Sequence, residues 1–171
     1  MISRYSRKEL VKIWSEENKY KIWLDVEVAA AEAMEKLKII PRGVSKIVRK
    51  KGRINVKRIH QIENKVKHDV IAFLTSITEK AGIKARYLHQ GMTSSDVLDT
   101  SFNIQLVQSG SMLLKDIDKI LNILKKKQKS INLLLVLEEV MASMRSRLHL
   151  GLNWHLFMKS LKEIKKDYRV L

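Results

Sequence analysis

The residues best suited to chemistry lie together in the stretch His89–Thr100, which reads His-Gln-Gly-Met-Thr-Ser-Ser-Asp-Val-Leu-Asp-Thr. Thr93 can cap a helix start there, with Asp96 as its capping-box partner and Gly91 permitting a tight turn before it. Backbone N–H groups and the helix dipole at such a start favour an anion, so with the hydroxyl of Ser94 the pattern predicts an anion-binding site. For an isolated Thr-Ser-x-Asp, a capped helix without a ligand is the favoured interpretation.

The composition favours a folded, soluble domain. With 171 residues, of which 45% are hydrophobic, the chain is long enough for one domain with a real core and is not compositionally disordered. The absence of cysteine excludes disulfides and thiolate metal sites. The sequence starts without the apolar run of a signal peptide, and no apolar stretch approaches the length of a membrane span. We therefore expect a cytoplasmic protein without membrane contact.

The net charge of +16 makes nucleic acid a partner to be weighed. The 34 basic residues are scattered among 18 acidic ones, and the densest basic clusters cover 49–53 and 125–129. Neither cluster is interleaved with aromatic residues that could stack on bases. We therefore expect no specific nucleic-acid partner, and we keep a small basic helical nucleic-acid-binding protein as the alternative to an enzyme.

Apolar residues recur at helical spacing, and the chain has one proline and six glycines, which predicts an all-α fold. Ser6 can cap a short helix that runs to about Glu17, and a longer helix follows to about Lys38. The predicted buried seam of this longer helix consists of Trp23, Val26, Ala30, Ala33 and Leu37. Pro41 and Gly43 end it.

Three shorter helices are predicted next, each with a local start or stop signal. The first covers 44–51 and closes at Gly52. Asn55 can cap the second, which runs to about Lys67. The third opens at Asp69 and closes at Gly82. Its apolar residues are Val70, Phe73, Leu74, Ile77 and Ala81.

A long helix from about Ser94 to Lys127 completes the pattern, with its apolar residues in one stripe. The stripe consists of Phe102, Leu106, Leu113, Ile117, Ile120 and Leu124. Gly110 lies inside this helix and weakens it modestly. Because the chain supplies few partners for so long a stripe, we expect a truncated helical bundle that other subunits or missing residues would complete.

Three motifs resemble the adenylosuccinate lyases, a family of the fumarase/aspartase superfamily. The stretch His89–Thr100 is similar to the family's first signature, His-x-Gly-Leu-Thr-Ser-x-Asp-Val-x-Asp-Thr, with Met92 where Leu is common. Arg4-Tyr5 and Lys67-His68-Asp69-Val70 stand at the expected distances upstream. The resemblance implies a lyase of purine biosynthesis that eliminates fumarate from adenylosuccinate and from the succinyl-carboxamide ribotide. It also implies a homotetramer that needs no metal or organic cofactor.

The resemblance assigns roles to the two upstream motifs. His68 is the implied catalytic residue, with Asp69 beside it at the substrate, and imidazole suits that task near neutral pH. Arg4 and Tyr5 match a phosphate-binding pair, which suits a guanidinium fork and a hydroxyl. Taken alone, Asp69 could simply cap a helix with His68 at its flank, and an Arg-Tyr pair is more typical of solvated surface.

The first signature receives its roles in the same way. Thr93 and Ser94 match residues that hydrogen-bond the succinyl part of the substrate, where a carboxylate would meet N–H groups and hydroxyls together. His89 matches the motif in type and receives no catalytic role. His60 lies in an ordinary helical stretch and is interpreted as surface.

After Ile131 the family's second signature, which holds a catalytic histidine, is missing. When the third base of each codon from Leu137 is joined to the first two bases of the next, the codons permit Gly-Arg-Ser-His-Gly-Ile-His-Ala-Glu-Pro-Thr-Thr-Phe-Gly-Leu-Lys-Leu-Ala-Leu. This string matches the second signature. We therefore predict a frame shift between about Ile131 and Leu137. Because they would lie in the out-of-frame part, His149, Trp154 and His155 are not interpreted as ligands or bases.

The predicted organisation follows from this shift. It comprises an N-terminal helical domain over 1–93, the start of the central bundle over 94–133 and an out-of-frame tail over 134–171, which can still form a helix by composition. The family's general acid belongs to the missing signature, and its general base is a serine on a mobile loop beyond the matched residues. We therefore expect the chain to be inactive alone, and a truncated lyase that serves as a non-catalytic partner of full-length subunits is a third interpretation.

Overall fold

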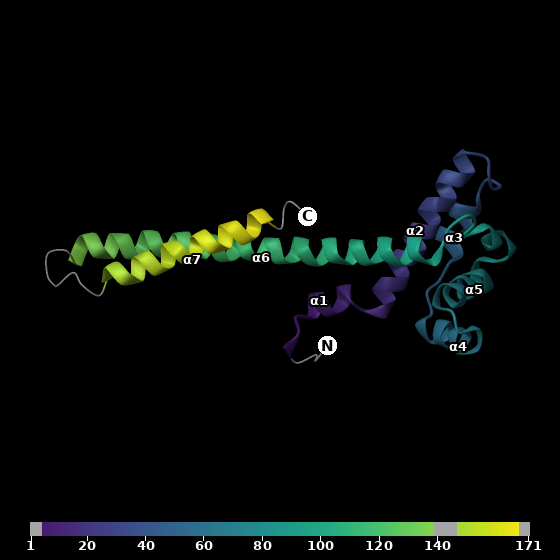
Figure 1. The fold of residues 1–171 in the computed structure, drawn as a ribbon, viewed down its shortest axis with the longest axis horizontal. Helices are drawn as coiled ribbons and strands as arrows, with labels where there is room; N and C mark the ends of the chain where they lie inside the picture. The colour runs from purple at the N-terminus through teal and green to yellow at the C-terminus, as the bar shows by residue number, and fades with distance from the viewer. Residues whose placement is uncertain (1–4, 139–146, 168–171) are drawn as a thin grey trace. The chain divides into compact units, whose positions relative to one another are not determined.

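The computed structural model describes the backbone of residues 5–138 and 147–167 and the side chains of 5–127 and 156–166. Every regular element in these ranges is helical, which confirms the predicted all-α class (Figure 1). The helices are α1 (Lys8–Ile13), α2 (Glu16–Lys36), α3 (Val44–Lys51), α4 (Val56–Val66), α5 (Asp69–Ala81), the 3₁₀ helix η2 (Ile83–Tyr87), α6 (Ser94–Glu138) and α7 (Arg147–Asp167). None of the described helices combines the length and the apolar character that a membrane crossing requires.

The chain divides into two compact units, Met1–Gln108 and Ser109–Leu171. The first unit holds α1 to α5, η2 and the first turns of α6, and it carries all the predicted site residues. The second unit holds the rest of α6 together with α7. In this second unit Lys165 of α7 forms an ion pair with Asp118 of α6, and Met158 and Leu121 are both buried.

The junction between α1 and α2 differs from the prediction. Arg7 occupies the N-cap position of α1, so the predicted cap at Ser6 is wrong. The chain breaks at Ser15, not near Glu17, because the Ser15 hydroxyl accepts the backbone N–H of Asn18 at 3.2 Å and starts α2. Of the two serines, Ser6 and Ser15, only Ser15 therefore caps a helix, and that helix is α2.

The predicted seam of α2 is correct in its first half and wrong in its second. Trp23 is buried and Val26 and Ala30 are partly buried, but Ala33 and Leu37 are exposed, the latter by 70%. The face that packs against the core instead consists of Tyr20, Ile22, Trp23, Glu27, Val28 and Ala31. Apolar residues surround much of α2, so their spacing alone does not select one face.

The bounds of α3, α4 and α5 confirm the predictions. Gly52 follows α3, and the side chain of Asn55 accepts the backbone N–H of Arg58 at 3.0 Å at the start of α4. Gly82 ends α5 with a φ of 84°, a conformation that favours glycine. His68 occupies the N-cap position of α5, so it does more than flank the helix.

One core joins these helices to the start of α6. Tyr20, Trp23 and Phe73 form its aromatic centre, with Tyr20 stacked on Phe73 at a ring-centroid distance of 5.9 Å. Val97 of α6 is fully buried in the same cluster. The indole N–H of Trp23 donates to the hydroxyl of Ser101 at 2.9 Å, which adds a directional bond between α2 and α6.

The long helix α6 confirms the prediction and extends it from about Lys127 to Glu138. Most of its predicted stripe is exposed, as expected for a helix that the chain covers only in part: the exposed members are Phe102, Leu106, Leu113 and Ile120. Helix α7 confirms that part of the tail is helical. The side chains of His149, Trp154 and His155 lie outside the described residues.

Candidate functional site

The start of α6 has the reciprocal half of the predicted capping box. The carboxylate of Asp96 accepts the backbone N–H of Thr93 at 2.7 Å, and the N–H of Asp96 donates to the carbonyl oxygen of Thr93 at 3.2 Å. Thr93 is exposed and Ser94 is half-buried. Both hydroxyls therefore stand at a helix start that solvent, and hence an anion, can reach.

The turn before this helix start has an unusual backbone. His89 has a φ of 61° and Gly91 a φ of 70°, so a non-glycine residue adopts the left-handed conformation in the signature. The N–H of Met92 donates to the carbonyl oxygen of His89 at 3.4 Å and closes the turn. Something must stabilise His89 in this conformation, because it costs free energy for residues with a Cβ.

Glu27 of α2 supplies that stabilisation, and the sequence analysis missed it. Its side chain is 0% exposed, and one carboxylate oxygen, Oε2, accepts the backbone N–H of His89 at 2.8 Å. The other oxygen, Oε1, lies 2.7 Å from the ring Nδ1 of His89. A signal did exist in the sequence: Trp23, Glu27 and Ala31 recur every fourth residue, which puts the acid on the buried face.

His68 and Asp69 form the second part of the candidate site at the start of α5. The Nδ1 atom of His68 accepts the backbone N–H of Ile71 at 3.4 Å, and the Oδ1 atom of Asp69 accepts that of Val70 at 2.7 Å. The two side chains are 42% and 40% exposed. Both polar groups therefore serve the helix start and remain open to solvent.

The geometry favours one proton arrangement on His68. Its Nδ1 atom lies 3.6 Å from the Oδ1 atom of Asp69, which is too long for a hydrogen bond, whereas it accepts the N–H of Ile71 in a longer than usual hydrogen bond of 3.4 Å. An Nδ1 that accepts a hydrogen bond carries no proton, so the neutral ring carries its proton on Nε2. His68 can therefore offer an N–H donor to a ligand.

Tyr20 lies near this second part of the site. Burial, followed by the negative charges of Glu63, Glu16 and Asp69, raises its pKa from 10.0 to about 12. Its hydroxyl therefore keeps its proton to a more alkaline pH than an ordinary tyrosine does. The carboxylate of Asp69 thus contributes to the electrostatics of the aromatic core as well as to the helix start.

The third predicted part falls at the edge of the described residues. Arg4 lies outside them, and Tyr5 is 75% exposed. The exposure of Tyr5 leaves its ring accessible to a ligand. Phosphate binding by Arg4 and Tyr5 therefore stays a prediction from the sequence.

The structure anchors the first two parts on one core without joining them. Val70, next to Asp69, and Val97, three residues after Ser94, are both fully buried in the same cluster. Within the described part of the chain, no hydrogen bond or ion pair connects His68 or Asp69 to the start of α6. Each part is therefore anchored to the core by a buried neighbour, and no described bond links one part to the other.

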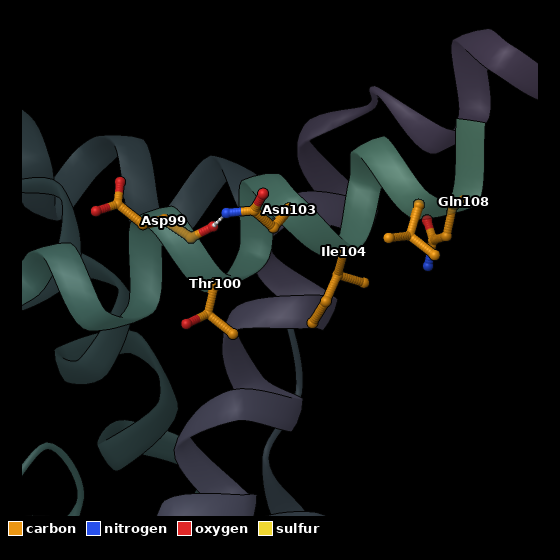
Figure 2. Close-up of a pocket in the computed structure, with 6 residues that line it drawn as sticks. Asp99, Thr100, Asn103, Ile104 and Gln108 are labelled. Carbon is orange, nitrogen blue, oxygen red and sulfur yellow. Dashed lines mark hydrogen bonds between the residues drawn. The ribbon is translucent and has the colours of Figure 1, made fainter. Parts of the chain in front are cut away.

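A shallow hollow follows the start of α6 on one exposed face of the helix (Figure 2). Its volume is about 490 Å³, and it is lined by Asp99, Thr100, Asn103, Ile104, Val107 and Gln108. These residues all belong to α6, and the side chain of Asn103 donates to the carbonyl oxygen of Asp99 at 2.8 Å. Among the described residues the lining comes from this helix alone and lacks the convergent polar groups of a ligand pocket. We call these six lining residues the α6 outer face.

Comparisons with known proteins agree on the family. A family model described as "Lyase" matches residues 3–136. Adenylosuccinate lyase of Bacillus subtilis (strain 168) is 40% identical over 129 residues, which cover 75% of this chain and 30% of the relative. Adenylosuccinate lyase of Aquifex aeolicus (strain VF5) is 44% identical over 129 residues, which cover 74% and 30%. The chain therefore spans about 30% of the length of these relatives.

Solved structures support the same fold. A fumarate lyase from Mesorhizobium sp. BNC1 matches with a TM-score of 0.75 and 18% identity, over 96% of this chain and 41% of that one. The 3-carboxy-cis,cis-muconate lactonizing enzyme from Pseudomonas putida matches with a TM-score of 0.65 and 19% identity, over 74% and 30%. At these identities the likeness shows the helical fold alone.

Proposed function

This chain belongs to the lyase family that residues 3–136 match, and from that premise we propose that it carries the N-terminal part of an adenylosuccinate lyase. Such an enzyme eliminates fumarate from adenylosuccinate and from the succinyl-carboxamide ribotide of purine biosynthesis. The observation that carries the proposal is the similarity to two adenylosuccinate lyases across the segment that holds both described parts of the site.

The start of α6 suits the succinyl part of the substrate. Elimination beside a carboxylate builds negative charge on that carboxylate, which needs hydrogen-bond donors around it. The hydroxyls of Thr93 and Ser94 and the N–H groups of the first turn would supply them. The carboxylate of Asp96 binds the backbone N–H of Thr93, so this cap does not use the Thr93 hydroxyl.

The start of α5 and the N-terminal pair would serve other groups of the substrate. In this proposal His68 acts in catalysis as a donor through Nε2, with Asp69 beside it at the substrate. Arg4 and Tyr5 would bind the phosphate. No step requires a metal or an organic cofactor.

Each of the two described parts bonds to its own helix start, and no described hydrogen bond or ion pair joins them, which favours a site shared between subunits. By the resemblance, family sites combine residues from three subunits of a homotetramer, and the proton-transfer residues come from later segments. We therefore propose a cytoplasmic homo-oligomer with a small nucleotide substrate, in which this chain contributes only one share of each site. The binding residues that this chain retains are therefore not sufficient for turnover by the chain alone.

The proposed domain organisation remains 1–93, 94–133 and an out-of-frame tail over 134–171. The family match ends at residue 136, close to the proposed shift between residues 131 and 137, which supports this division. The helix α7 does not oppose it, because Leu- and Lys-rich composition favours a helix in either case.

The test compares the present gene with one whose frame is restored by insertion of a single base between codons 131 and 137. We expect the restored product to release fumarate from adenylosuccinate, measured by absorbance, and the present chain to show none above a no-protein blank. Turnover by the present chain would contradict the missing proton-transfer residues. A soluble restored product without turnover would contradict the proposed activity.

A further inference from the structure

The buried acid Glu27 is the least expected polar group in the core of the first unit. It is 0% exposed, while its partner His89 is 20% exposed in its side chain. An isolated buried carboxylate is costly, and it is retained only where hydrogen bonds compensate for the lost hydration. Both oxygens of Glu27 have such bonds, and both bonds go to the same residue, His89.

The pairing fixes the proton on the His89 ring. A carboxylate accepts hydrogen bonds and cannot donate them, so the 2.7 Å contact between Oε1 and Nδ1 requires a proton on Nδ1. The neutral ring then carries no proton on Nε2, which becomes the only ring nitrogen left for another partner. The arrangement is the reverse of that at His68, where Nδ1 accepts and Nε2 carries the proton.

The same carboxylate also fixes the backbone of the turn. The N–H of His89 is bound to Oε2 at 2.8 Å, and the residue has a φ of 61°. From His89 the turn passes through Gly91 and Met92 to Thr93, whose N–H is held by Asp96. Hydrogen bonds therefore hold both ends of this turn, from Glu27 in the core to His89 and from Asp96 to Thr93 at the start of α6.

We propose that Glu27 is the positioning residue of this site. It selects the Nδ1–H form of His89 and holds the left-handed turn that places Thr93 and Ser94. Nε2 of His89 is thereby presented as a hydrogen-bond acceptor, four residues before Thr93 at the helix start that we propose for the succinyl carboxylate. That the positioned turn serves a substrate rests on the function proposed above, whereas the tautomer and the turn are properties of the chain itself.

The test is ¹⁵N magic-angle-spinning NMR of the full chain with labelled histidine, which does not depend on particle size. Spectra are recorded at a pH where histidine is neutral, and the His89 signals are identified by their loss in His89→Asn. We expect a proton on Nδ1 of His89, whereas free imidazole side chains in water prefer Nε2–H. A proton on Nε2 and none on Nδ1 in the unsubstituted chain overturns the proposal by itself, even if no variant folds.

Two variants separate positioning from general stability. In Glu27→Leu we expect the His89 proton to move to Nε2 and amide exchange of Met92 and Thr93 to accelerate about tenfold or more, since a hydrogen bond to a charged group is lost. Glu35→Leu is the matched control, because Glu35 on the same helix also accepts two N–H groups, in its case the backbone N–H groups of Gly43 and Ser45. It should leave the His89 spectrum unchanged.

Each outcome decides the matter. A His89 tautomer that is the same in Glu27→Leu as in the unsubstituted chain overturns the proposal, as does an equal shift in both variants. The result is independent of lyase activity, so a failure of the proposed function leaves it standing and a failure of the pairing leaves the proposed function standing.

Discussion

Two glutamates of α2 each bind two N–H groups, with different consequences. Glu35 accepts the N–H of Ser45 at 2.6 Å and that of Gly43 at 3.0 Å at the start of α3. These backbone hydrogen bonds, Ser45 first, lower the pKa of Glu35. Glu27 instead binds the backbone and ring of one residue, His89. Glu35 therefore caps a helix, whereas Glu27 orders a turn at the candidate site.

Tyr20 makes stability depend on pH at the alkaline end. Its pKa is about 12 in the folded chain and 10.0 ordinarily, so the folded state binds the phenol proton more tightly. The resulting stability is fully present below pH 10 and is lost as the pH rises through 12. We expect the unfolding free energy to fall by about 2 kcal/mol more between these pH values than in a chain without the hydroxyl.

The measurement is urea unfolding at both pH values for the unsubstituted chain and for Tyr20→Phe. Lysines and the other tyrosines titrate in both proteins, so their effects cancel in the comparison. If the two proteins lose the same unfolding free energy, the pKa of Tyr20 is not raised by the fold.

At the residue scale, the sequence predicted hydrogen bonds between residues that are close together in the chain. Thr93 and Asp96 form part of their capping box, because the two residues are three apart on one helix start. Glu27 was missed because its partner is 62 residues away, and no local pattern joins them. The role of His89 depends on that pairing and was missed with it.

At the scale of elements, helix ends were easier to predict than helix faces. The ends of α3 and α5 are marked by Gly52 and Gly82, and the start of α4 by Asn55. The buried face of α2 is decided by the helices that pack on it, which are α3 and α4 together with Phe73 of α5 and Ser101 of α6. Its predicted seam therefore included the exposed Leu37 and omitted the buried Tyr20.

Gly52 is required by a close backbone approach. A Cβ added there would lie 2.6 Å from the carbonyl oxygen of Val48, and that backbone atom cannot move without disturbing the end of α3. We expect Gly52→Ala to lower the unfolding free energy by about 1–3 kcal/mol. Chemical denaturation followed by tryptophan fluorescence reports it, because Trp23 lies in the same core.

Gly110→Ala is the matched control inside α6. A Cβ at Gly110 meets nothing within 4 Å, and alanine is favoured over glycine in a helix by about 1 kcal/mol. We therefore expect greater helix stability by circular dichroism, opposite in sign to the effect at Gly52. Equal destabilisation by both substitutions would contradict the close approach at Gly52.

At the scale of the whole molecule, the α6 outer face should mediate self-association. Val107 is 67% exposed and Ile104 is 37% exposed in a region whose relatives form a helical bundle by the resemblance. We expect the purified chain to elute as oligomers or heterogeneous aggregates, and Val107→Glu to shift it toward the monomer in size-exclusion chromatography.

Ile71→Glu is the control for added charge. Ile71 is 48% exposed on α5, away from the α6 outer face. This substitution should leave the elution profile unchanged. A compact, cooperatively melting monomer without any substitution would contradict the expectation of an incomplete bundle.

The central claim is that residues 3–136 supply functional substrate-binding and catalytic residues to an adenylosuccinate lyase active site. The most direct measurement is fumarate release by a chimera in which residues 3–136 of this chain replace the matching segment of the Bacillus subtilis enzyme. We expect turnover, a loss of roughly 10²-fold or more in kcat/KM for His68→Gln, and little change for His60→Gln, whose ring pairs with the exposed Glu16. A soluble tetrameric chimera that releases no fumarate, or one in which both histidine variants behave alike, would contradict the claim.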